Sequence, residues 1–167
     1  PVPPLQAFQK ELKAKLLAVM EREQERTRCV LSLPTGGGKT RVAVEAFIDW
    51  MQPRFVNGQY LIWIAQSEEL CEQAIATLEQ MWGSREYRFP LRVYRYFGGR
   101  DVPLEELQGG AVVASINQLY NRIQSGDPAL DQMLSHTGVM VIDEAHRAVT
   151  HMYDVLLNYA EELVGPD

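Results

Sequence analysis

A glycine-rich segment beside a lysine and a threonine has the residue types needed to hold phosphate. In order, its residues are Pro34, Thr35, Gly36, Gly37, Gly38, Lys39 and Thr40. Glycines let backbone N–H groups wrap around an oxyanion because no Cβ blocks the approach, and the helix predicted over 39–51 adds its positive N-terminus. We expect Lys39 to reach the β- and γ-phosphates of a nucleotide and the Thr40 hydroxyl to bind Mg²⁺. Leu33 occupies the position where this motif usually has its first glycine.

A pair of carboxylates follows a second apolar run far downstream. The four apolar residues 139–142 precede Asp143 and Glu144, and such a run is typical of a strand buried on both faces of a parallel sheet. The carboxyl ends of these strands are where α/β sheets bind their ligands. Asp143 would then bind Mg²⁺ through a water molecule, and Glu144 would polarise the attacking water.

Each motif alone also has a structural interpretation, as a glycine turn or as a capped strand end. The two motifs together, in this order, favour a nucleotide-hydrolysing site. Lys39 and Glu144 are the predicted catalytic residues, because phosphoryl transfer relies on positioning and charge stabilisation.

Composition limits the classes of protein that fit. The chain has 167 residues, 46% of them hydrophobic, which is the size of one globular domain. No apolar stretch approaches the roughly 20 residues of a membrane helix. A net charge of −6 argues against coating nucleic acid by bulk charge. Cys29 and Cys71 fit reduced core thiols of a cytosolic protein, and the first residue, Pro1, suggests an excerpt of a longer chain.

The apolar patterns alternate between strands and helices. Strands are predicted over 29–33, 60–65, 91–97, 111–115 and 139–142. Helices are predicted over 5–24, 39–51, 67–82, 117–124 and 152–164, with a turn at 125–128 and Gly138 just before the last strand. This alternation predicts an α/β domain with a parallel sheet and right-handed crossovers. His136 and His151 are expected on the surface or in loops.

These motifs together resemble the first RecA-like domain of a superfamily two helicase or translocase. Residues 34–40 resemble its motif I, and Asp143-Glu144-Ala145-His146 resembles its motif II. Residues 64–70 and 113–119 match the positions of motifs Ia and Ib, and residues 5–9 match the upstream element that reads adenine. Within the superfamily, the loop and the motif II segment are most similar to the type III restriction subunit and related bacterial DNA translocases.

The resemblance implies further roles for single residues. Gln9 would read the adenine edge, or else be a solvated helix residue. His146 would couple the ATP site to the partner domain, or else bond to a neighbouring loop. Contacts to the nucleic-acid backbone are implied for Gln66, Ser67, Gly98, Gly99, Arg100 and Ser115, for which capping or turn formation is the structural alternative.

A strip of arginines and aromatic residues over 85–100 has two interpretations. Its arginines could contact phosphates while its aromatic residues stack on bases. The alternative is a strand with core aromatics and solvated arginines. Its members are Arg85, Tyr87, Arg88, Phe89, Arg92, Tyr94, Arg95, Tyr96, Phe97 and Arg100.

The resemblance also implies a three-layer RecA-like P-loop NTPase fold and a larger machine. Residues 1–24 would form the adenine-reading helix and 29–167 the phosphate-loop core, ending before the family's next strand and its second RecA-like domain. We expect ATP and Mg²⁺ as cofactors, DNA rather than RNA as partner, the bacterial cytosol as location, and a nuclease or methyltransferase as a further partner. ATP hydrolysis is expected of the full-length protein and little of this segment alone. The alternatives are a nucleotide-gated binding module and an RNA helicase.

Overall fold

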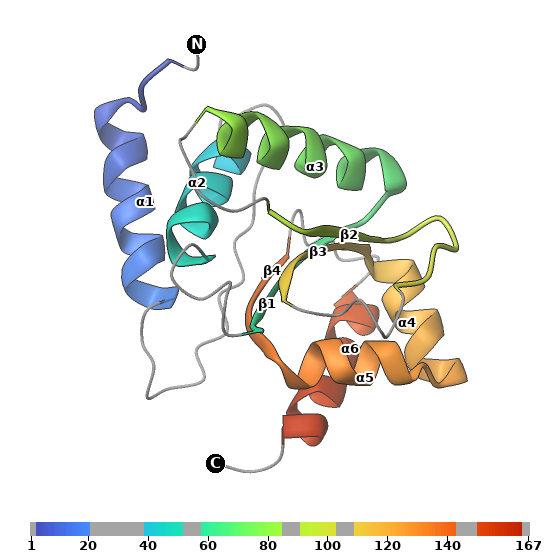
Figure 1. Ribbon diagram of the computed structural model, residues 1–167. Helices are drawn as coiled ribbons and strands as arrows, with labels where there is room; N and C mark the ends of the chain where they lie inside the picture. Colours follow the sequence, from blue (N-terminus) through green and yellow to red (C-terminus); the bar gives the residue numbers. More distant parts are fainter. Residues whose placement is uncertain are drawn as a thin grey trace.

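The computed structural model describes residues 3–20, 39–51, 58–84, 91–102, 109–142 and 150–164. Within these ranges the elements are α1 (Ala7–Met20), α2 (Lys39–Met51), β1 (Tyr60–Ala65), α3 (Glu68–Gly83), β2 (Val93–Tyr96), β3 (Gly110–Ser115), α4 (Ile116–Ser125), α5 (Pro128–Ser135), β4 (Thr137–Ile142) and α6 (Thr150–Val164). Figure 1 shows them arranged as helices on both sides of one sheet. The predicted strand 29–33 lies outside the described residues.

The four described strands form one parallel sheet in the order β2-β3-β1-β4. Every residue of β1 and β3 is buried, because helices cover both faces, and this burial explains their unbroken apolar sequences. The register pairs Ala65 with Ser115, Ile64 with Ile142 and Tyr96 with Ala114. The prediction of a parallel α/β sheet is therefore confirmed.

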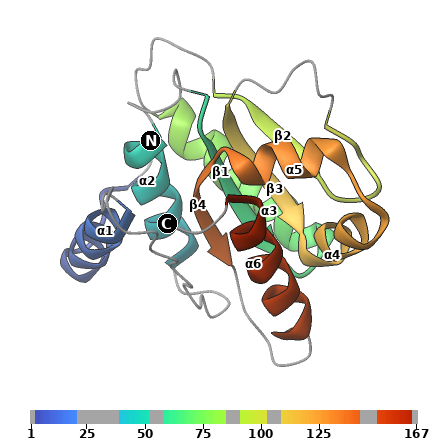
Figure 2. The same ribbon diagram turned by 90° about the horizontal axis from the view of Figure 1, so that it is seen from below.

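Side chains of the strands alternate between two separate cores. Leu61, Trp63 and Ala65 of β1 face the core that also contains the buried residues of α2 and α3, whereas Ile62 and Ile64 face the core shared with α4, α5 and α6. Figure 2 shows the two helical layers on opposite sides of the sheet. The molecule thus has three layers, with the sheet in the middle.

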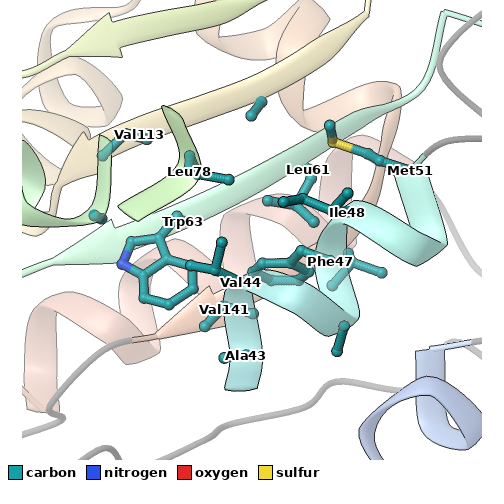
Figure 3. Packing of buried hydrophobic residues seen from close by; sticks show 14 of the residues in the cluster. Ala43, Val44, Phe47, Ile48, Met51, Leu61, Trp63, Leu78, Val113 and Val141 are labelled. Atoms are coloured by element: carbon teal, nitrogen blue, oxygen red, sulfur yellow. The ribbon is translucent and has the colours of Figure 1, made fainter. Parts of the chain in front are cut away.

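Helix α2 packs on β1 and β4 through its apolar stripe. Phe47 meets Trp63 edge to face, with ring centroids 5.5 Å apart. Figure 3 shows Val44 and Phe47 of α2 over Trp63 of β1, with Val141 of β4 close by. Met51 and Ile48 continue the same stripe toward Leu61. This packing fixes where the first turn of α2 lies relative to the strand ends.

Helix α1 lies against α2 and runs in the same direction. Near the start of both helices, Arg41 donates a hydrogen bond to the carbonyl of Pro3. Further along, the Lys13 ammonium lies 2.8 Å from the Asp49 carboxylate. At their ends the Trp50 indole N–H donates to the Met20 carbonyl at 3.1 Å. These three contacts hold the N-terminal segment alongside α2.

Helix α5 was absent from the sequence prediction, which placed only a turn at 125–128. Asp127 is in fact its N-cap, accepting from the Ala129 N–H at 3.0 Å, and Pro128 occupies the first turn. The buried residues of α5 are Ala129, Leu130, Met133 and Leu134. Their helical spacing is a signal in the sequence that the turn-forming residues concealed.

The bounds of other elements differ from the prediction in smaller ways. The described part of the first helix is Ala7–Met20 within the predicted 5–24. Helices α4 and α6 begin one and two residues earlier than predicted, at Ile116 and Thr150. Gly138 lies inside β4 and not before it, at the point where the register between β1 and β4 shifts. None of the described helices is long and apolar enough to cross a membrane.

Candidate functional site

All four described strands end at one edge of the sheet. Because the strands are parallel, their carboxyl ends share this edge, where α/β proteins bind ligands. The residues that end them are Ala65, Tyr96, Ser115 and Ile142. The segments leading away from this edge contain most of the candidate residues identified from the sequence.

The first turn of α2 also lies at this carboxyl edge. Trp50, near the end of the helix, packs on Gly138 at the start of β4, so α2 runs against the strand direction. From Trp50 back to Lys39 the helix covers about 16 Å, and from Gly138 to Ile142 the strand covers about 13 Å. The start of α2 and the end of β4 therefore reach the same side of the sheet.

The two motifs that are predicted to carry the chemistry border these two points. Lys39 is the first residue of α2, and the structure describes only its backbone. Thr40 is the next residue and is half-buried. Ile142 ends β4, immediately before the carboxylate pair. The other predicted members of the nucleotide site lie outside the described residues, namely Pro34, Thr35, Gly36, Gly37, Gly38, Asp143, Glu144 and His146.

A magnesium ion bound together with a nucleotide fits this arrangement. Mg²⁺ is usually held by one or two protein groups together with substrate phosphates and water. Thr40 supplies a hydroxyl in the first turn of α2, where the helix dipole also favours phosphate. Within the described ranges no group of three or more His, Cys, Asp or Glu side chains could hold a metal by itself.

Gln9 caps the start of α1. Its Oε1 accepts a hydrogen bond from the Gln6 N–H at 2.9 Å, which is the return half of a capping box three residues into the helix. The amide also carries an NH₂ donor. Arg41 holds Pro3, just before this cap, against the first turn of α2. The segment predicted to read adenine is thus fastened to the helix that follows the phosphate loop.

Gln66 and Ser67 lie between β1 and α3. Ser67 is the N-cap of α3, and its Oγ accepts from the Leu70 N–H at 3.2 Å. Glu68 and Glu69 follow in the first turn and complement the helix dipole. Ser67 therefore has the capping role that was the structural alternative, and two acidic residues lie next to it.

Ser115 ends β3 and caps α4. Its Oγ accepts from the Gln118 N–H at 3.2 Å, and the residue is only 6% exposed. The next segment at the same edge is the loop after β2, with Gly98, Gly99 and Arg100 all exposed. Structural capping therefore accounts for the Ser115 hydroxyl, whereas the glycine loop faces solvent.

Gln118 is a residue of this edge that sequence reasoning missed. Its side chain bonds to the backbone of both Gly99 and Arg100, at 2.8 Å each. Gln118 follows Ser115 by three residues, which is the spacing of a capping box. This spacing was the signal in the sequence that could have identified Gln118. In a capping box, however, the Gln118 side chain would turn back to the Ser115 N–H, and here it reaches the neighbouring loop.

In the described part of the arginine and aromatic strip, the structure shows the second interpretation, a strand with the aromatic residues Tyr96, at its end, and Phe97, just after it, in the core. Tyr96 and Phe97 are at most 1% exposed and belong to the two different cores, so neither can stack on a base. Arg95 lies 3.7 Å from Glu72. In the described part of this strip Arg92, Arg95 and Arg100 are exposed, whereas Arg85, Tyr87, Arg88 and Phe89 lie outside the described residues.

An ionic cluster beneath the glycine loop joins β2, α4 and α5. The Tyr96 hydroxyl donates to Asp127, and Arg122 pairs with both Asp101 and Asp127. Burial, followed by the hydrogen bond to Asp127, raises the pKa of Tyr96 well above its usual range. The hydrogen bond to Asp101 raises the pKa of Arg122. The Tyr96 phenol therefore stays neutral and the Arg122 guanidinium stays charged at neutral pH.

Comparison with known protein families agrees with this geometry. The family model described as "Type III restriction enzyme, res subunit" matches residues 3–164. None of the curated proteins compared with the chain matches it. The family match covers nearly every residue, including both motifs and all six described helices. The chain is thus a helicase-like ATP-binding module with a RecA-like α/β fold, and it belongs to the family of the type III restriction enzyme res subunit.

Proposed function

We propose that this chain is the ATP-binding half of an ATP-dependent translocase or helicase that acts on DNA rather than RNA. The observation that carries the proposal is that the start of α2 and the end of β4 reach the same side of a parallel sheet, at its carboxyl edge. Membership of the res subunit family supports the same assignment.

The proposed chemistry is hydrolysis of the γ-phosphate. Residues 34–38 would cradle the phosphates with backbone N–H groups, and Lys39 would bind the β- and γ-phosphates. Thr40 and Asp143 would hold Mg²⁺, which neutralises charge on the phosphate oxygens when bound. Glu144 would orient the attacking water. These roles come from the two sequence motifs, and the shared edge of the two bordering elements supports them.

Two residues would connect this site to its surroundings. Gln9 would recognise adenine from the start of α1, a position supported by the attachment of Pro3 to Arg41. His146 would couple the site to a second RecA-like domain. That domain would supply an arginine finger, which is worth roughly 10³–10⁵ in rate in comparable phosphoryl-transfer enzymes.

Nucleic acid would contact the same edge of the sheet through the loop 98–100 and the start of α4. Support comes from the exposure of Gly98, Gly99 and Arg100 and from the open space beside Gly99, where a Cβ would meet nothing within 4 Å. Gln66 and Ser67 are further candidates, with Glu68 and Glu69 beside them in the first turn of α3; the Glu68 carboxylate also lies close to Gly98. Phosphate contacts of this type fix position on the strand and carry no sequence information.

The test is phosphate release by the intact protein with ATP alone, with a DNA duplex and with an RNA duplex of the same sequence. We expect stimulation by DNA, and loss of hydrolysis with retained ATP binding in Glu144→Gln. Glu79→Gln, on the exposed side of α3, is the matched control and should behave as the unmodified protein. Equal rates for Glu144→Gln and the control would favour a nucleotide-gated binding module, and stimulation by RNA alone would favour an RNA helicase.

A further inference from the structure

A buried glutamine on α4 holds the glycine loop that follows β2. The Gln118 side chain is buried, with the residue 8% exposed. Its Oε1 accepts from the Gly99 N–H, and its Nε2 donates to the Arg100 carbonyl. A side-chain amide is the group that can accept and donate at once, so one residue satisfies two neighbouring backbone groups of the loop.

The loop itself is a tight turn with a defined inner and outer side. The Arg100 N–H donates to the Phe97 carbonyl at 3.2 Å. Gly98 and Gly99 have φ values of 64° and 76°, as in a type I′ turn, in which both central residues need positive φ. The buried Phe97 ring anchors the turn, and the Arg100 guanidinium lies 5.2 Å from the ring centroid.

Gln118 also belongs to the first turn of α4. Its own N–H is bonded to Ser115 at the end of β3, and β3 pairs with β2 through Ala114 and Tyr96. Gln118 consequently connects the end of β3 through its backbone N–H, and the glycine loop through its side chain, to the start of α4. The glycine loop therefore depends on the Gln118 side chain for its attachment to α4.

We propose that Gln118 is a positioning residue that presents the loop 98–100 to the phosphate backbone of nucleic acid. This inference rests on the proposed function. Glycine loses more conformational freedom on ordering than other residues, so two adjacent glycines without the clamp would have to be ordered by the ligand. That ordering cost reduces the favourable free energy of nucleic-acid binding. Loss of the clamp therefore weakens DNA binding and leaves the ATP chemistry intact.

Three variants of the intact protein test this role. Gln118→Met removes both hydrogen bonds at similar side-chain size. Gln118→Glu keeps the acceptor for the Gly99 N–H and loses the donor to Arg100. Gln124→Met, at an exposed position of the same helix, is the matched control. The measurements are ATP hydrolysis without DNA, the concentration of a blunt DNA duplex that gives half-maximal stimulation, and the thermal unfolding midpoint.

We expect Gln118→Met to raise the half-stimulating DNA concentration by about tenfold, the size of effect that follows from losing buried hydrogen bonds. Gln118→Glu should fall between Gln118→Met and the control. Hydrolysis without DNA should match that of Gln124→Met. If Gln118→Met does not fold, the glutamate variant carries the same comparison.

Two results would overturn the inference while leaving the proposed function in place. One is a half-stimulating DNA concentration for both Gln118 variants equal to that of the control. The other is an equal loss of DNA-dependent and DNA-independent hydrolysis, which would indicate a purely structural residue. Absence of stimulation by any nucleic acid in the unmodified protein would instead overturn the proposed function, and this inference with it.

Discussion

The indole ring of Trp50 occupies the space in which a side chain at position 138 would begin. A Cβ on Gly138 would lie 2.4 Å from one ring carbon of Trp50 and 2.8 Å from another. Trp50 is 3% exposed and bonded through its indole N–H to Met20, so the ring has little room to move. This contact sets the end of α2 against the start of β4.

We expect Gly138→Ala to lower the free energy of unfolding by about 1–3 kcal/mol, the usual cost of overpacking a fixed core group. Denaturant unfolding of the intact protein measures it. Gly83→Ala is the matched control, because a Cβ there meets nothing within 4 Å. Equal stability of the two variants would show that Trp50 moves freely and that the contact does not position α2.

Arg41 gives a prediction about nucleotide selectivity. Its guanidinium donates to the Pro3 carbonyl and lies 3.7 Å from Glu45, and within the described ranges its buried Nε has no hydrogen-bond partner. Arg41→Met removes the attachment of the N-terminal segment while leaving helix propensity and apolar volume similar. Because this segment carries the proposed adenine contact at Gln9, the KM for ATP should rise severalfold and the preference for ATP over GTP should fall.

Steady-state hydrolysis with each nucleotide checks this, with Lys15→Met as control. Lys15 pairs only across the exposed surface of α1, 3.5 Å from Glu11, and such pairs contribute little. If Arg41→Met changes the turnover number for both nucleotides equally and leaves KM unaffected, the residue acts on the phosphate loop and not on adenine recognition.

The sequence was sufficient to predict the four described strands, their parallel pairing and most of the helix positions. Strands such as Tyr60–Ala65 are apolar on both faces, and that pattern depends on local sequence alone. The cap at Ser67 was likewise readable, since a serine before two glutamates is a local signal. These features needed no knowledge of distant contacts.

Other features depend on contacts between distant parts of the chain. The clamp from Gln118 to Gly99 joins two segments whose proximity follows only from the order of β2 and β3 in the sheet. The close packing of the Trp50 ring on Gly138 likewise joins two distant parts of the chain. Helix α5 was missed for a different reason, because Asp127 and Pro128 are common both in turns and at helix starts.

Tyr159 predicts a stability change at alkaline pH. Its hydroxyl donates to Asp131, and this hydrogen bond, followed by burial, raises the pKa of Tyr159 to about 12 from an ordinary value of 10.0. The unfolded chain therefore loses this proton before the folded chain does, and the stabilisation is complete below pH 10 and falls as the pH rises toward 12. The stability difference between the unmodified protein and Tyr159→Phe should shrink over that interval. A constant difference in denaturant unfolding would show that the Asp131 contact does not hold the proton.

Thr40 offers the most direct test of metal binding from a described residue. It is the second residue of α2 and half-buried, and its hydroxyl is the proposed Mg²⁺ ligand from this helix. Thr40→Val removes the hydroxyl at similar shape, whereas Thr40→Ser keeps it. We expect the Mg²⁺ concentration for half-maximal hydrolysis to rise at least about tenfold in Thr40→Val and to be nearly normal in Thr40→Ser. Loss of a metal-bound or metal-orienting group typically costs 10–100-fold in affinity.

Thr77→Val, which loses only a hydrogen bond to the Gln73 carbonyl within α3, is the control. An unchanged Mg²⁺ requirement in Thr40→Val would show that the Thr40 hydroxyl does not bind the metal. The nucleotide would then have to bind elsewhere along the carboxyl edge.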